Sequence, residues 1–78
     1  MHTMRLSCDR HEFWVDVRLA AMNGRWIASA DTPYGPSLGL AFTPRRALVQ
    51  ALEPFDGVIA ELLATAPPGL LDHGAMGY

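Results

Sequence analysis

Hydrophobic and polar residues alternate over residues 12–22 of the chain. Every second side chain there is apolar, which is the pattern of a strand with one buried face. Asn23 and Gly24 follow, and this pair tolerates the positive φ angles that a tight two-residue turn requires. Residues 25–31 then provide a return strand. The pattern therefore predicts a β-hairpin.

The two-residue turn also predicts which residues of the hairpin lie opposite each other. It pairs Met22 with Arg25 and Asp16 with Asp31. One face of the hairpin then has no charge and is expected to join the core; it consists of Phe13, Val15, Val17, Leu19, Trp26, Ala28 and Ala30. On the opposite face the two aspartates repel each other unless Arg18 lies diagonally between them.

Two further strands are expected beside the hairpin. A loop rich in proline and glycine precedes residues 37–42, which predict a strand with Leu38, Leu40 and Phe42 on one side. Residues 4–8 alternate more weakly and are compatible with a strand in front of the hairpin.

A helix is predicted over residues 43–65. Thr43 can cap its first turn, and Pro44 at the first helical position lacks an N–H that would be unpaired there anyway. Apolar residues then recur at steps of three and four, forming one stripe; they are Ala47, Leu48, Ala51, Leu52, Phe55, Val58, Ile59, Leu62 and Leu63. Pro54 interrupts the hydrogen bonds and Gly57 weakens the helix further, so a single bent helix is expected.

Together these elements predict an α+β fold, with a three- or four-stranded antiparallel sheet (β-β-β-α order) and one bent helix packed on one face. We expect a single domain over residues 1–66. Residues 67–78 show no periodicity and are expected to form a C-terminal tail that docks through Leu70 and Leu71.

No second helix remains to cover the other face of the predicted sheet. That face carries Trp14, Arg18, Met22 and Ile27, and apolar patches of this kind are typical of partner or dimer interfaces. The alternative interpretation is that these are scattered surface hydrophobic residues, which are common in soluble proteins.

The length and the net charge of the chain argue against several classes of function. The 78 residues suffice for one small core, and no apolar run approaches the ~20 residues of a membrane helix. The start of the chain lacks the layout of a signal peptide, so a cytoplasmic protein is expected. A net charge of −2, with six arginines and no lysine, argues against a dedicated nucleic-acid binder. Arg45 and Arg46 form the one local cluster of positive charge. They either contact a partner or an anion, or are simply two solvated side chains.

Catalytic motifs are not found in the sequence, and we predict that the protein is not an enzyme. Cys8 and His11 could form half of a zinc site, but a closed site needs about four ligands, so no metal and no cofactor is predicted. The acidic residues beside Cys8 are expected to raise the pKa of its thiol. Asp16 and Asp31 would lie on an open sheet surface rather than in a pocket. No glycine-rich phosphate-binding motif occurs.

A resemblance to a known family rests on the hairpin segment Gly24-Arg25-Trp26-Ile27-Ala28, the turn rich in proline and glycine, Gly39, Thr43, and the pairs Ala47-Leu48 and Ala51-Leu52. Over residues 12–65 this arrangement resembles the antitoxin domain of the HicB family. Two features depart from the family pattern: Arg45-Arg46 stands where acidic residues are usual, and Gly39 lies four residues ahead of Thr43 rather than two.

The resemblance implies a dimeric protein that binds and neutralises a small toxin which cleaves messenger RNA. Members often carry a DNA-binding segment after this domain, and this chain is expected to have none. We therefore predict a small non-enzymatic interaction module, HicB-like, that forms a homodimer and binds a small toxin-like protein. The alternative is a nucleic-acid-binding homodimer in which Arg45 and Arg46 of two chains combine into one basic strip.

Overall fold

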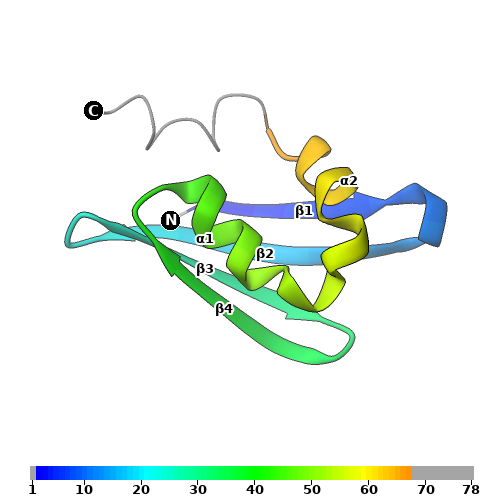
Figure 1. Ribbon diagram of the computed structural model, residues 1–78, viewed down its shortest axis with the longest axis horizontal. Coiled ribbons are helices and arrows are strands. Elements are labelled where there is room, and N and C mark those ends of the chain that lie inside the picture. The colour runs from blue at the N-terminus through cyan, green and yellow to red at the C-terminus, as the bar shows by residue number, and fades with distance from the viewer. Residues whose placement is uncertain (1, 68–78) are drawn as a thin grey trace.

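The computed structural model describes residues 2–67, which form a four-stranded sheet with two α-helices packed against it (Figure 1). The strands are β1 (His2–Cys8), β2 (Phe13–Met22), β3 (Arg25–Thr32) and β4 (Gly35–Ala41), and they form one antiparallel sheet in the order β1-β2-β3-β4. The helices are α1 (Pro44–Ala51) and α2 (Ile59–Ala64). Two 3₁₀ segments, η1 (Asp9–His11) and η2 (Glu53–Val58), connect β1 to β2 and α1 to α2. The predicted α+β fold is confirmed, with four strands.

The central hairpin has the predicted register. Met22 lies opposite Arg25 and Asp16 lies opposite Asp31. Asn23 adopts a φ of 53° and Gly24 a φ of 78°, the left-handed conformations that a primed two-residue turn requires. Local turn chemistry is thus sufficient to set the pairing of β2 with β3.

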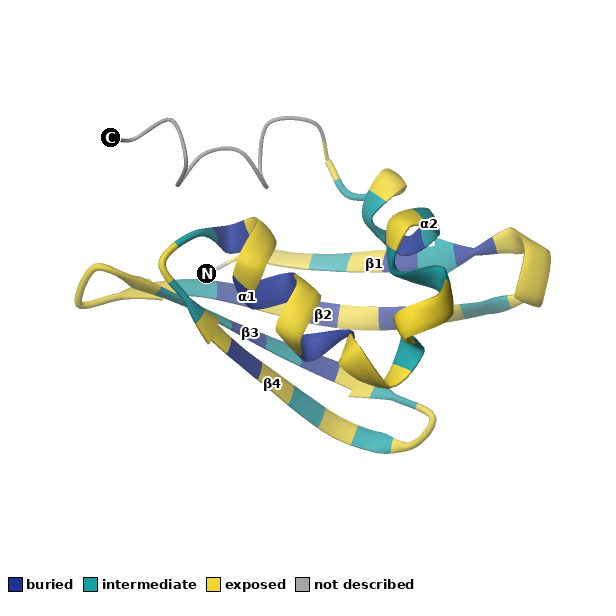
Figure 2. Cartoon of the chain, in the orientation of Figure 1, coloured by how far each residue is buried: buried dark blue, intermediate teal, exposed yellow. Residues whose placement is uncertain are grey.

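The core lies between one face of the sheet and the two helices. Buried and exposed residues alternate along the strands, as Figure 2 shows. The fully buried sheet residues include most of the predicted core face of the hairpin, namely Val15, Val17, Leu19, Ala28 and Ala30, whereas Phe13 and Trp26 are partly buried. Leu6 and Cys8 extend this face onto β1, so the weakly alternating N-terminal segment is a true core strand.

The predicted start of the helix is confirmed. Thr43 has an extended backbone, and its Oγ1 accepts a hydrogen bond from the Arg46 N–H at 3.1 Å. Pro44 occupies the first turn of α1.

The single bent helix is instead two short helices. Pro54 has no N–H and its ring would clash with the carbonyl four residues earlier, so α1 ends at Ala51. Phe55 then adopts a non-helical backbone (φ −114°, ψ 37°). The chain turns there, and α1 packs on β3 and β4 whereas α2 packs on β1 (Figure 1). The apolar stripe still faces the core in both helices.

Gly39 allows α1 to approach β4 closely. An added Cβ at this position would lie 1.9 Å from the carbonyl oxygen of Ala47, in the backbone of α1. The helix backbone therefore rests on the strand itself, and Gln50 Oε1 accepts a hydrogen bond from the Leu40 N–H at 3.0 Å beside this contact.

Within residues 2–67, no helix has the length and apolar character needed to span a membrane. The predicted tail lies, apart from Pro67, outside the residues that the structure describes, as do Leu70 and Leu71.

Candidate functional site

We use the term outer face for the side of the sheet that points away from α1 and α2. Its side chains are Thr3, Arg5 and Ser7 of β1, Trp14, Asp16, Arg18, Ala20 and Met22 of β2, Arg25, Ile27, Ser29 and Asp31 of β3, Pro36, Leu38 and Leu40 of β4, and Phe42. Large hydrophobic side chains on this face are exposed to solvent, including Leu38 and Phe42 at 70% each. None of the described residues covers them.

The apolar part of the outer face is larger than the sequence indicated. The sequence predicts that Leu38 and Leu40 share one side of a strand but not which face of the sheet that side joins. The register places them opposite Ser29 and Ile27, on the outer face. This follows from Gly39, because only glycine fits between β4 and α1, and the alternate positions of the strand must then point outward. A glycine between two leucines was the sequence signal for this arrangement.

The four predicted interface residues share the outer face but do not form one cluster. Met22 is exposed and Ile27 is half-buried in the neighbouring row, where it lies between Ala20 and Leu40. Trp14 lies eight positions before Met22 on β2, roughly 26 Å away at the rise of a strand. The apolar strip, which we define as Met22, Ile27, Leu38, Leu40 and Phe42, is therefore separate from Trp14.

Ion pairs occupy the half of the outer face near β1. Arg5 donates two hydrogen bonds to Asp16, from Nε to Oδ1 at 2.8 Å and from Nη2 to Oδ2 at 3.3 Å. Arg18 Nη2 donates to Asp31 Oδ2 at 3.2 Å. Each of the two facing aspartates thus has its own guanidinium, and the hydrogen bonds from Arg5, with its charge, hold the pKa of Asp16 below its ordinary value. Such paired, exposed carboxylates are not arranged as an acid–base pair.

Trp14 also lies in this polar half. The guanidinium carbon of Arg5 is 5.2 Å from the centre of the Trp14 ring, within cation–π range. Trp14 therefore has a partner within its own chain, unlike the side chains of the apolar strip at Leu38 and Leu40.

Arg45 and Arg46 lie in the first turn of α1 and are exposed. Because α1 packs on the inner side of the sheet, these arginines belong to the helical layer, three and four residues after Phe42 of the chain. The two predicted contact sites therefore lie on different layers of the molecule.

A cluster of ionisable side chains lies at the end of β1. The sequence indicated Cys8 and His11 as members of it, but not the residues of α2. Cys8 is 2% exposed, and its thiol donates a hydrogen bond to Glu61 Oε2 of α2, with Sγ and Oε2 2.9 Å apart. This hydrogen bond, together with burial, raises the pKa of Cys8, so the predicted direction is correct although its main cause is Glu61 and not the adjacent acids. Arg10 pairs with Oε1 of the same carboxylate. His11 completes the cluster.

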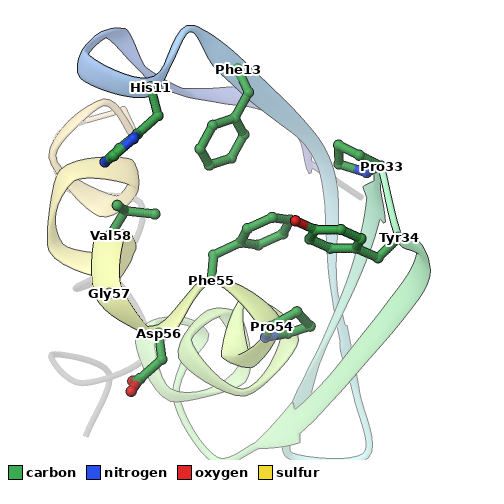
Figure 3. Close-up of a pocket in the computed structure, with 9 residues that line it drawn as sticks. All are labelled: His11, Phe13, Pro33, Tyr34, Pro54, Phe55, Asp56, Gly57 and Val58. Carbon is green, nitrogen blue, oxygen red and sulfur yellow. The ribbon is translucent and has the colours of Figure 1, made fainter.

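An aromatic pocket lies between η2, the start of β2 and the loop between β3 and β4 (Figure 3). Its volume is about 560 Å³. The Phe55 ring stacks with Phe13 at 5.1 Å and with Tyr34 at 5.6 Å between ring centres. Among the lining residues only His11 and Asp56 bear ionisable groups apart from Tyr34, and the Asp56 carboxylate points away from the rings (Figure 3). Such a lining favours apolar contact over acid–base chemistry.

Comparison with protein-family models, curated proteins and solved structures gives no match to this chain. The resemblance to HicB antitoxins stays a prediction from the residues named above, and the candidate functions rest on the geometry of this chain alone.

Proposed function

We propose that this protein is a small non-enzymatic interaction module that forms a homodimer through its outer face. The supporting observation is the apolar strip, whose Leu38 and Phe42 side chains are each 70% exposed. Contiguous exposed hydrophobic residues on a sheet are typical of interaction surfaces, because burying them removes apolar area from water.

A second copy of the chain is a suitable partner for this face because the outer faces of two copies would not repel each other through unpaired charges of the same sign. Both of its aspartates are already paired with arginines of the same chain, and Arg25 lies over the Phe42 ring at 5.1 Å from the ring centre. A two-fold axis through the apolar strip would set it against its own copy, with the ion pairs at the rim.

The size of the outer face sets the expected affinity. Four strands of about seven residues present roughly 19 Å by 23 Å, or about 450 Å² per chain. Two copies would bury on the order of 900 Å², which is in the range of weak or transient interfaces. We therefore expect a dissociation constant in the micromolar range rather than an obligate dimer.

Sedimentation velocity over a concentration series tests the dimer. The protein should be largely dimeric at about 100 µM and dissociate on dilution, because the expected interface is small. Leu38→Glu should give a monomer at all concentrations. Val49→Glu is the matched control, because Val49 is also an exposed hydrophobic residue but lies on α1. A wild-type protein that is monomeric at about 100 µM, or equal effects of both substitutions, would contradict the proposal.

Trp14→Asp separates the two halves of the outer face. If the apolar strip is the interface, this change should weaken the dimer much less than Leu38→Glu does. Full dissociation by Trp14→Asp alone would move the interface to the polar half.

An HicB-like role would add a small toxin-like protein as a further partner. It is supported by the resemblance over residues 12–65 alone. Co-expression with the product of the adjacent gene, followed by purification on a tag, should recover a complex if this role is correct. Recovery of the tagged chain by itself would count against it.

The alternative, a nucleic-acid-binding homodimer, is supported by the exposure of Arg45 and Arg46 on α1, in the helical layer, which dimerisation through the outer face does not cover. Binding of labelled RNA or DNA should then weaken steeply with salt and disappear in an Arg45→Glu/Arg46→Glu variant. Absence of binding at low salt excludes this function.

A further inference from the structure

Cys8, His11 and Glu61 bring three metal-binding donor atoms together at one end of the sheet. The thiol sulfur, an imidazole nitrogen and a carboxylate oxygen all lie within 4.8 Å of one another. Glu61 is 53 residues from Cys8 along the chain, so only the packing of α2 on β1 assembles the group. The cluster lies apart from the outer face and is independent of the dimer proposed above.

Neighbouring contacts hold the side chains of Cys8 and Glu61 in place, and the local backbone positions His11. Cys8 ends β1 and is buried against the core, while the Ser7 N–H donates a hydrogen bond to Thr65 Oγ1 at 3.0 Å and ties β1 to the end of α2. The 3₁₀ segment η1 places His11 one turn after Cys8, and Glu12 ends it in a left-handed conformation (φ 54°). The backbone positions of Cys8, His11 and Glu61 are thus fixed by β1 and η1 on one side of the cluster and by α2 on the other.

We propose that Cys8, His11 and Glu61 bind a divalent transition-metal ion, and that Zn²⁺ suits this donor set best. Thiolate, imidazole and carboxylate bind Zn²⁺ at about 2.3, 2.0 and 2.1 Å, which places tetrahedral ligand atoms roughly 3.3 to 3.6 Å apart. The separations in the structure span these values, from 2.9 Å for sulfur and oxygen to at most 4.8 Å. Calcium and magnesium are disfavoured because they prefer oxygen ligands throughout.

The ion would replace one proton. In the metal-free protein the Cys8 thiol hydrogen bridges to Glu61 Oε2. On binding, that proton leaves for solvent, the thiolate and Oε2 both bind the ion, and the sulfur–oxygen distance widens by less than about 1 Å. The neutral His11 imidazole binds the ion as well, and the three protein ligands displace water molecules from the hydrated ion.

Arg10 supports the carboxylate without blocking the site. It pairs with Oε1 of Glu61, which leaves Oε2 free to bind the ion. Outer partners of this type orient metal ligands in many proteins. Three protein ligands leave a fourth coordination position of the ion for water. The site is accessible from solvent through His11, which is exposed and also lines the aromatic pocket (Figure 3).

Titration of the reduced 78-residue chain with Co²⁺ tests the site. Co²⁺ is a spectroscopic substitute for Zn²⁺, and thiolate ligation gives a sulfur-to-cobalt charge-transfer band in the near ultraviolet. We expect the band to saturate at one ion per chain and to be lost when one equivalent of Zn²⁺ is added. Calorimetry with Zn²⁺ then gives the affinity.

Variants identify the ligands. Cys8→Ser keeps a hydrogen-bond donor toward Glu61 and should abolish the band, while Glu61→Gln and His11→Ala should each weaken Zn²⁺ binding at least about tenfold, the lower limit seen even for loss of an outer partner. The chain has two other histidines, and a His2→Gln/His73→Gln double variant is the matched control, with unchanged affinity expected. Circular dichroism of each variant confirms that it is folded.

Three results would overturn the proposal. The first is no charge-transfer band at stoichiometric Co²⁺ in the wild-type protein. The second is a band and an affinity that persist unchanged in both Glu61→Gln and His11→Ala. The third is an equal loss of affinity in the double-histidine control, which would show that Cys8 binds metal with ligands outside this cluster.

Discussion

Replacing Gly39 by alanine measures how closely α1 packs on β4. The added Cβ would lie 1.9 Å from the Ala47 carbonyl oxygen and 2.8 Å from the Ala51 nitrogen, both in the helix backbone. An ordinary contact begins at 3.4 Å, so α1 must withdraw by about 1.5 Å. Backbone atoms cannot rotate away as a flexible side chain can, so the helix must move as a unit and partly expose Leu48.

The expected cost is at the upper end of the overpacking range, about 3 kcal/mol. A domain of this length has a free energy of unfolding of roughly 4 to 12 kcal/mol, so the variant loses a large fraction of its stability. For a domain of 60 to 100 residues, 3 kcal/mol corresponds to a fall in Tm of more than about 10 °C.

Urea unfolding followed by tryptophan fluorescence provides the measurement, because Trp14 and Trp26 both lie in the sheet. The experiment is done at low protein concentration so that association does not contribute to stability. Gly57→Ala is the control: it makes the same chemical change where no atom lies within 4 Å, and it should be neutral or stabilise by about 0.4 to 1 kcal/mol. A Gly39→Ala protein within about 0.5 kcal/mol of wild type would refute the close contact between α1 and β4.

Three further predictions concern stability. Thr43→Ala removes the side chain that caps α1 and should reduce the free energy of unfolding by about 1 kcal/mol, measured by the same urea titration. Because pairing with Arg5 lowers the pKa of Asp16 in the folded state, the pair stabilises the fold above the ordinary aspartate pKa of about 3.9, and this contribution is lost as the pH falls through the lower folded value. Asp16→Asn should therefore make the acid limb of a Tm-against-pH profile slightly shallower, with a small effect because the pair is exposed; a steeper acid limb would contradict this. The hydrogen bond to Glu61 raises the pKa of Cys8, so its contribution is complete below the ordinary thiol pKa of about 8.5 and is lost as the pH rises through the raised folded value. Cys8→Ser should flatten the alkaline limb of the profile recorded with a chelator present, and an alkaline limb identical to wild type would exclude this assignment.

The local sequence was sufficient to predict the hairpin and the start of the helix. Asn23 and Gly24 accept the backbone angles that only a few residues tolerate, and a side-chain period of two leaves one register that buries Val15, Val17 and Leu19 of β2 together. Thr43 and Pro44 act within a single turn of the chain, so the beginning of α1 also needed no tertiary information.

Three features depended on tertiary packing. They are the face of the sheet that Leu38 and Leu40 occupy, the division of the expected helix into α1 and α2, and the cluster of Cys8, His11 and Glu61. An alternating strand has two faces of equal local merit; the glycine between two leucines was a sequence signal for the choice, and the register of β4 with β3 and the contact of Gly39 with α1 show which face points inward. Pro54 predicted an interruption, but the direction of α2 followed from its packing against β1. Glu61 reaches Cys8 and His11 through that same packing, because a contact between residues 53 positions apart leaves no periodic signal in the chain. Sequence patterns report on turns and periods of a few residues, whereas such sites form only when separate elements share one core.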